Sequence, residues 1–240
     1  MSKNNIPFSI TNRRRWVASF VAVALGLAIA MATSRTEANT QAVVFYGDSL
    51  TAAFGIDPSL GYPALLQEKI EDAGLANEFT VVSSAVSGET SKGGLKRLNW
   101  ALKGVSRSHE DLGLFMLALG ANDGLRGHSV DAMTSNLNAI LKQVRNQFPG
   151  ARLVVAGMLM PPNLGEDYRT RFRDAFIEVA EANNATLIPF LLEGVAGRPE
   201  LNLPDQMHPN EKGQKVMADN LWPVIEPLLV EKRKEQGSDQ

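Results

Sequence analysis

A serine, a histidine and an aspartate in this chain have the side-chain types of an acyl-transfer site. Ser49 follows an apolar run, and His208 has Asp205 three residues before it. A serine hydroxyl attacks an acyl carbon when a base takes its proton, and an acid must hold that base in one tautomer. A single turn places residues three apart on one side, and Pro204 and Pro209 stiffen this segment. The pattern predicts Ser49 as nucleophile, His208 as base and Asp205 as the acid that orients it.

Each of these residues also has a purely structural interpretation. The tetrapeptide Gly-Asp-Ser-Leu at 47–50 can be a helix N-cap, and the segment around His208 can be a polar loop before the last helix. Two other histidines follow residue 40. We expect His109 to face solvent in a polar loop, and His128 follows a glycine-rich stretch without an obvious orienting acid. His208 therefore remains the favoured base.

Acyl transfer also needs hydrogen-bond donors for the charge that develops on the carbonyl oxygen. The backbone N–H of Ser49 would lie at a strand-to-helix turn, Gly88 offers an unobstructed backbone N–H, and Asn122 offers a side-chain N–H. Taken singly, Gly88 and Asn122 are better explained as turn residues. Their joint occurrence with a serine, histidine and aspartate favours an oxyanion hole.

Metal and cofactor chemistry have no comparable motif. The chain contains no cysteine, which excludes disulfides, thiol nucleophiles and thiolate metal sites. HExxH, P-loop and GxGxxG motifs are absent, and no second histidine lies near enough to His208 in the sequence to build a metal site. We therefore expect hydrolysis with no cofactor and no metal.

Short apolar runs alternate with helix-periodic segments between residues 42 and 230. The runs predict five strands, at 42–46, 79–84, 112–119, 152–158 and 186–188. The three best defined are continuously apolar, as expected for strands buried on both faces of a parallel sheet. Apolar residues at steps of three and four predict helices near 62–72, 91–102, 130–148, 168–179 and 216–228. The last helix is expected to bend or end at Pro223 and Pro227.

This alternation predicts an α/β fold, a three-layer α/β/α sandwich with a five-stranded parallel sheet. Ligands of such folds bind at the carboxyl ends of the strands. Three polar motifs follow predicted strands directly, at 47–50, 87–90 and 120–124. The motifs are therefore expected to meet at one edge of the sheet.

Four blocks occur in the order of those of the SGNH, or GDSL, hydrolases: FYGDSL at 45–50, SGET at 87–90, GAND at 120–123 and DQMH at 205–208. The chain resembles this family over essentially its whole length after the first forty residues. GANDGLRG at 120–127 is similar to the subgroup of periplasmic thioesterase I, lysophospholipase L1 and arylesterases. The resemblance implies a flavodoxin-like sheet, a structural role for Asp48, the triad Ser49, Asp205 and His208, and the oxyanion donors Ser49, Gly88 and Asn122.

The same resemblance implies an esterase that forms an acyl-enzyme on Ser49. Its expected substrates are aryl esters, short-to-medium acyl thioesters and lysophospholipids. A carbohydrate O-deacetylase is an alternative within the family, and a non-catalytic binding module on the same fold is an alternative outside enzymes. All five catalytic positions are present, which argues against the module.

The loop after the fourth strand, at 158–168, is rich in Met, Leu and Pro. Flexible methionine side chains suit a pocket that accepts acyl chains of different lengths. Met158 and Leu159 can equally finish the buried strand. We therefore expect Met160, Pro162 and Leu164 to line the acyl channel.

Residues 1–38 have the order of a secretory signal peptide. Lys3 and the arginines at 13–15 precede an apolar run at 16–31, and Thr36-Glu37-Ala38 is a small-x-small cleavage site. An uncleaved membrane anchor is the alternative, although the run is near the short limit for spanning a bilayer. The arginines are compatible with either a Sec or a twin-arginine signal.

Cleavage after Ala38 would leave a hydrolase domain at 39–230 and a charged tail at 231–240 in the periplasm or outside the cell. The removed segment carries five basic side chains and one acidic side chain, so the net charge would change from −2 to −6. A mildly acidic chain gives no reason to expect nucleic acid as a partner. No heptad pattern or exposed apolar stripe indicates an oligomer, so a monomer is the default expectation.

Overall fold

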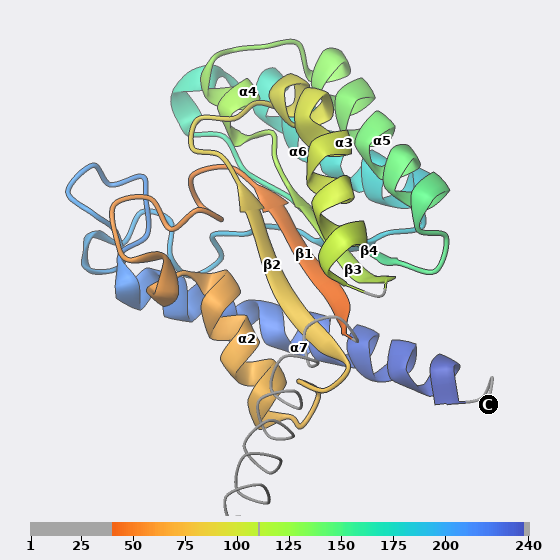
Figure 1. Cartoon of the computed structure of the whole chain (residues 1–240). Helices are drawn as coiled ribbons and strands as arrows, with labels where there is room; N and C mark the ends of the chain where they lie inside the picture. The colour runs from red at the N-terminus through yellow and green to blue at the C-terminus, as the bar shows by residue number, and fades with distance from the viewer. Residues whose placement is uncertain (1–39, 110, 238–240) are drawn as a thin grey trace, which may run out of the picture. The chain divides into compact units, whose positions relative to one another are not determined.

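The computed structural model describes residues 40–109 and 111–237, and the predicted signal peptide lies outside the described residues. Five parallel strands form one sheet in the order β2-β1-β3-β4-β5 (Figure 1). The strands are β1 Gln41–Gly47, β2 Phe79–Ala85, β3 Asp111–Ala118, β4 Arg152–Ala156 and β5 Thr186–Ile188. This arrangement confirms the predicted five-stranded parallel sheet, with each strand within a few residues of its expected position.

The central strands are buried on both faces. Every residue of β1 is buried, as is every residue of β3 after Asp111 and of β4 after Arg152. In β2 only Phe79 is buried, because this strand lies at the edge of the sheet. The continuously apolar runs in the sequence therefore mark the centre of the sheet, as parallel packing requires.

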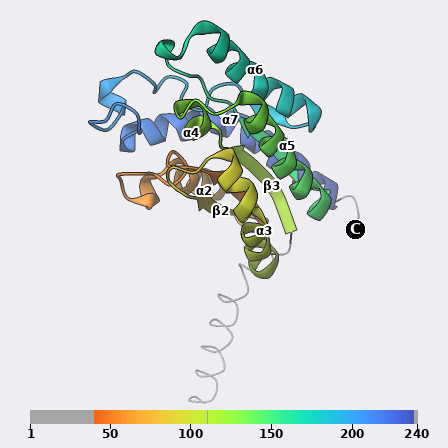
Figure 2. The ribbon, with the colours of Figure 1, turned by 90° about the horizontal axis from the view of Figure 1, so that it is seen from above.

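Helices cover both faces of the sheet. On one face α2 packs against α7, and on the other α3 packs against α5 and α5 against α6 (Figures 1 and 2). The long helices are α2 Tyr62–Asp72, α3 Ser91–Ser108, α5 Val130–Gln147, α6 Glu166–Ala182 and α7 Glu211–Gly237. Short helical segments are η3 Pro58–Leu60, α4 Ala121–Leu125, η4 Pro162–Leu164 and η5 Pro199–Leu201. The three-layer sandwich is confirmed.

The last helix differs from the expectation in two ways. α7 continues through Pro223 and Pro227, and it extends into the segment predicted as a separate charged tail. The helix continues through the two prolines because it buries four apolar side chains. Each of these is at most 1% exposed: Met217, Leu221, Ile225 and Leu229. Burying each contributes about 1.5–3 kcal/mol, so the four together contribute about 6–12 kcal/mol. That offsets the roughly 6 kcal/mol that two interior prolines cost.

The charged end of α7 has partners on the sheet side. Lys232 is 8% exposed, and its Nζ donates to the carbonyl of Gly150 at 2.9 Å. Arg152, the first residue of β4, pairs with Glu235. These contacts explain why no boundary exists at residue 230.

Strand order determines where a ligand can bind. From the central strand β1 the chain moves to β2 on one side of the sheet. It then returns to place β3, β4 and β5 one after another on the other side, so the direction in which strands are added reverses between β1 and β3. Helices on opposite faces leave a crevice outside the carboxyl ends of two such strands. The segment containing Ser49 follows β1, and α4 with Asn122 follows β3. The polar motifs therefore meet at the switch point of the sheet.

Candidate active site

The turn after β1 presents Ser49 at the edge of the sheet. Asp48 organises this turn, because its Oδ1 accepts the backbone N–H of Leu50 at 3.1 Å. Glycine is required at position 47, since a Cβ there would lie 2.0 Å from Thr51 Oγ1. The short motif 47–50 thus forms a tight turn that leaves the Ser49 side chain partly exposed.

A second turn holds Asp205 against His208. Oδ1 of Asp205 accepts the backbone N–H groups of Met207 at 2.9 Å and His208 at 3.0 Å, while Oδ2 lies 2.7 Å from His208 Nδ1. These hydrogen bonds, first among them the one from the His208 backbone, lower the pKa of Asp205 to about 2. The carboxylate is therefore ionised at neutral pH and can hold the imidazole with Nδ1 protonated.

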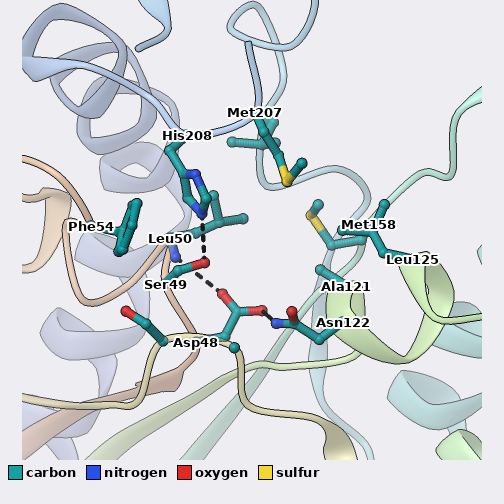
Figure 3. Close-up of a pocket in the computed structure, with 13 residues that line it drawn as sticks. Asp48, Ser49, Leu50, Phe54, Ala121, Asn122, Leu125, Met158, Met207 and His208 are labelled. Atoms are coloured by element: carbon teal, nitrogen blue, oxygen red, sulfur yellow. Dashed lines mark hydrogen bonds between the residues drawn. The ribbon is translucent and has the colours of Figure 1, made fainter. Parts of the chain in front are cut away.

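The two turns meet across 159 residues of sequence, with His208 Nε2 lying 3.0 Å from Ser49 Oγ (Figure 3). The ring of Phe54 packs against the imidazole at a centroid distance of 4.5 Å. The His208 side chain is 16% exposed. Serine, histidine and aspartate thus form a continuous hydrogen-bonded chain, as the sequence predicts, at a distance that suits proton transfer.

Asn122 and Gly88 lie in the same cavity as Ser49. Gly88 has φ +77°, a conformation that favours glycine. Nδ2 of Asn122 donates to Asp48 Oδ2 at 3.0 Å and to the carbonyl of Glu89 at 3.1 Å. Both N–H groups of this amide therefore already have acceptors, so an oxyanion bound there would have to replace one of them.

Asp48 connects the nucleophile turn to Asn122. Its side chain is enclosed, with 1% of the residue exposed, and burial raises its pKa to about 6 despite the N–H groups of Leu50 and Asn122 that favour its charged form. The sequence indicated only a structural residue here. Its contact with Asn122 joins positions 74 residues apart, and no local pattern signals such a contact.

The cavity at Ser49 has a volume of about 200 Å³. In Figure 3 His208 and Phe54 lie on one side of it, and Met158 and Leu125 lie on the opposite side. Phe54, Leu125 and Met207 are 45–50% exposed and form an apolar rim. The apolar lining residues are Leu50, Phe54, Ala121, Leu125, Met158, Leu192 and Met207.

The structure does not bring Met160, Pro162 and Leu164 into this cavity. Met160 is 5% exposed, and its sulfur fills the space beside Gly124 of α4, where a Cβ would lie 2.3 Å away. Pro162 and Leu164 belong to η4, which leads towards α6. Met158, two residues after the end of β4, lines the cavity instead. The methionine-rich loop therefore contributes one residue to the cavity, and it is a different one from the three expected.

The other two histidines lie outside the cavity. His109 lies two residues before β3, at the amino end of the sheet, with Nδ1 3.4 Å from Thr40 Oγ1. His128 Nδ1 lies 3.6 Å from Oδ1 of buried Asp123, an acid that the sequence did not reveal. That carboxylate already accepts the backbone N–H and the hydroxyl of Ser91. Neither histidine approaches Ser49 as His208 does.

Two features are absent from residues 40–109 and 111–237. Within these ranges no group of three or more acidic or histidine side chains is arranged to hold a metal ion. In the same part of the chain no helix combines the length and the apolar character needed to cross a bilayer.

Comparison with known proteins gives a consistent result. Residues 45–216 match the model of the GDSL-like lipase/acylhydrolase family. The esterase TesA of Pseudomonas aeruginosa is 37% identical over 85% of this chain and 96% of its own length. A crystal structure of TesA superposes with a TM-score of 0.72 at 37% identity, over 78% of this chain and 99% of that one.

Two further relatives are each 31% identical. An arylesterase of Vibrio mimicus matches over 81% of this chain and 93% of its own length. A protein of Escherichia coli described as thioesterase 1, protease 1 and lysophospholipase L1 matches over 78% of this chain and 84% of its own length.

Proposed function

This chain belongs to the GDSL-like lipase/acylhydrolase family, and from that premise we propose that it is an exported serine esterase that works through an acyl-enzyme on Ser49. Its relatives are esterases, an arylesterase and a thioesterase, so it hydrolyses esters or thioesters. One observation carries the mechanism: Ser49 Oγ, His208 and Asp205 form a chain of hydrogen bonds of 3.0 and 2.7 Å at an apolar cavity.

Acylation begins when Nε2 of His208 takes the proton of Ser49 and Oγ attacks the acyl carbon. The π electrons of the carbonyl move onto its oxygen, and Asp205 stabilises the imidazolium that forms. When the tetrahedral intermediate collapses, the bond to the alcohol or thiol breaks, and His208 gives its proton to the leaving group. Water then attacks the acyl-enzyme with His208 as base again, which releases the acid and restores Ser49.

The oxyanion of this intermediate is proposed to bind the backbone N–H groups of Ser49 and Gly88 and the side chain of Asn122. Both N–H groups of the Asn122 amide already have acceptors, so the oxyanion must replace one of these acceptors. The Glu89 carbonyl is the acceptor that can be replaced at lower cost, since it is neutral and Asp48 is a carboxylate. Asp48 then keeps the Asn122 amide in place, and the second N–H of that amide faces the substrate.

The size and lining of the cavity support acyl groups of short to medium length. A volume of about 200 Å³ is below the roughly 300–1,000 Å³ of typical ligand pockets. The exposed rim at Phe54, Leu125 and Met207 offers apolar surface to a longer chain or to an aryl leaving group. Aryl esters, acyl thioesters and lysophospholipids are the proposed substrates.

Export to the periplasm or the medium is part of the proposal and rests on the leader at 1–38. The protein released by cleavage is proposed to act as a monomer. No nucleic acid and no stable membrane insertion is proposed for the mature protein.

Hydrolysis of p-nitrophenyl acyl esters from acetate to palmitate tests the proposal. Wild type is expected to show a graded profile across chain lengths, and Ser49→Ala is expected to lose about 10⁴-fold or more in kcat, as losses of triad residues do. An alkyl phosphonate with a p-nitrophenyl leaving group should bond to Oγ of Ser49 with release of p-nitrophenol. The protein mass should then rise by that of the phosphonyl group in wild type and not in Ser49→Ala. Asn122→Ala should lower kcat by about 10²–10³-fold, as for one oxyanion donor.

The same panel separates the alternatives. Turnover of acetate alone would favour an O-deacetylase, and no turnover by folded wild type would favour a binding module. Wild-type rates in folded Ser49→Ala would rule out the assigned nucleophile. Loss of activity in EDTA, restored by a divalent ion, would replace the triad mechanism with a metal-dependent one.

A further inference from the structure

Arg97 of α3 contacts residues on both sides of Gly88 as well as the end of β1. From α3 its Nε donates to Glu89 Oε2 at 2.6 Å. Its Nη1 donates to Ser84 Oγ at 2.9 Å, and its Nη2 donates to the carbonyls of Ser84 at 3.0 Å and Gly47 at 3.4 Å. The guanidinium carbon also lies 4.0 Å from the centre of the Tyr46 ring.

These acceptors flank the proposed oxyanion donors. Gly47 lies two residues before Ser49, and Ser84 and Glu89 lie on either side of Gly88. The backbone carbonyl of Glu89 also accepts the Asn122 amide. Arg97 therefore connects the ends of β1 and β2 directly to the segments that carry Ser49 and Gly88. It reaches Asn122 only through Glu89, whose carbonyl holds the amide until the oxyanion replaces it.

Burial makes this connection stiff. The side chains of Arg97 and Glu89 are 18% and 8% exposed. Burial raises the pKa of Glu89, and Arg97 opposes that rise by favouring the charged carboxylate. A planar guanidinium can reach several acceptors in fixed directions and stack on a ring, whereas a lysine ammonium is a point charge that cannot do both.

We infer that Arg97 is a positioning residue of the active site, which sets the oxyanion donors by holding Glu89 and the ends of β1 and β2 in register. This inference rests on the proposed oxyanion roles of Gly88 and Asn122. Arg97 does not line the cavity and is not expected to touch substrate.

Arg97→Lys tests the inference on p-nitrophenyl butyrate. We expect kcat to fall about tenfold to a hundredfold, because small displacements of catalytic groups have effects of that size, while KM changes less than about twofold. Glu89→Gln keeps an acceptor for Arg97 and should retain most of kcat. Glu89→Ala should lose kcat as Arg97→Lys does, and it provides the same test if Arg97→Lys does not fold.

Arg145→Lys is the matched control. Arg145 also donates to several backbone carbonyls, those of Pro149, Ala151 and Asn183, but these precede β4 and β5 at the amino end of the sheet. It should leave kcat unchanged even if it lowers the unfolding midpoint. A purely structural role of Arg97 would make the two lysine variants behave alike.

A double-mutant cycle with Asn122→Ala completes the test. If Arg97 acts through the donors, Arg97→Lys should cost severalfold less in the Asn122→Ala background than in wild type, because one of the donors it positions is gone. Equal losses in the two backgrounds, or unchanged kcat in folded Arg97→Lys, would overturn the inference. Unchanged kcat in Asn122→Ala alone would instead overturn the oxyanion role on which the inference depends.

Discussion

At the scale of single residues, Asp48 is a buried ionisable side chain, so its protonation makes protein stability depend on pH. Burial raises its pKa from 3.8 to about 6. Between about pH 4 and 6 the folded protein therefore binds more protons than the unfolded chain, and the contribution of Asp48 to stability falls as pH rises. Asp48→Asn has no such titration. Relative to wild type, the free energy of unfolding of this variant should rise by about 2–3 kcal/mol from pH 4 to pH 7.

Urea unfolding of wild type and Asp48→Asn at a series of pH values measures this difference. A hydrogen bond that the variant loses at every pH shifts all its unfolding free energies equally, so it does not affect their change with pH. Asp205→Asn is the control for the sign. The pKa of Asp205 is lowered to about 2, so its stabilisation is present above pH 4 and is lost as pH falls towards 2. A difference between Asp48→Asn and wild type that does not vary with pH would show that Asp48 titrates as it does in the unfolded chain.

At the scale of elements, the segment that follows β4 and the end of α4 line the cavity, and η4 does not. Met158 and Leu125 line the cavity, whereas Leu164 packs partly buried against the core. Met158→Ala and Leu125→Ala should therefore lower kcat/KM on octanoyl esters more than on acetyl esters. At about 0.8 kcal/mol per buried CH₂, two methylenes that lose their contacts change the octanoyl-to-acetyl ratio about tenfold.

Leu164→Ala is the matched variant, because it also shortens an apolar side chain on the connection that follows β4. It should leave the octanoyl-to-acetyl ratio unchanged. A lower octanoyl-to-acetyl ratio in Leu164→Ala, together with an unchanged ratio in Met158→Ala, would show that the loop at 160–164 binds the acyl chain and that Met158 does not. Unfolding midpoints of all three variants separate a loss of folded protein from a change of specificity.

At the scale of the whole molecule, the leader at 1–38 is proposed to direct the enzyme out of the cytoplasm. Cleavage after Ala38 would leave 202 of the 240 residues with a net charge of −6. Protein recovered from the periplasm should therefore begin at Asn39, within a few residues, by N-terminal sequencing, and should elute as a monomer. Recovery of the intact leader in the membrane fraction would favour an uncleaved anchor.

Much of the architecture was determined by the sequence alone. Strands and helices follow from apolar periodicity, which is a local property, so all five strands and all five long helices were predicted near their observed positions. The turn that pairs Asp205 with His208 is also local, because it spans three residues between two prolines. The order of the four blocks was sufficient to identify the family.

Tertiary structure decided what depends on strand order and packing. The 3.0 Å contact of Ser49 with His208 joins residues 159 positions apart. The hydrogen bond of Asp48 with Asn122 crosses from the end of β1 to the segment after β3, and Arg97 of α3 reaches Gly47 at the end of β1. Periodicity shows that a residue is buried and not which residues it faces. For that reason Met158 could not be distinguished from Met160 as a cavity residue, and the prolines of α7 could not be weighed against the apolar face that it buries.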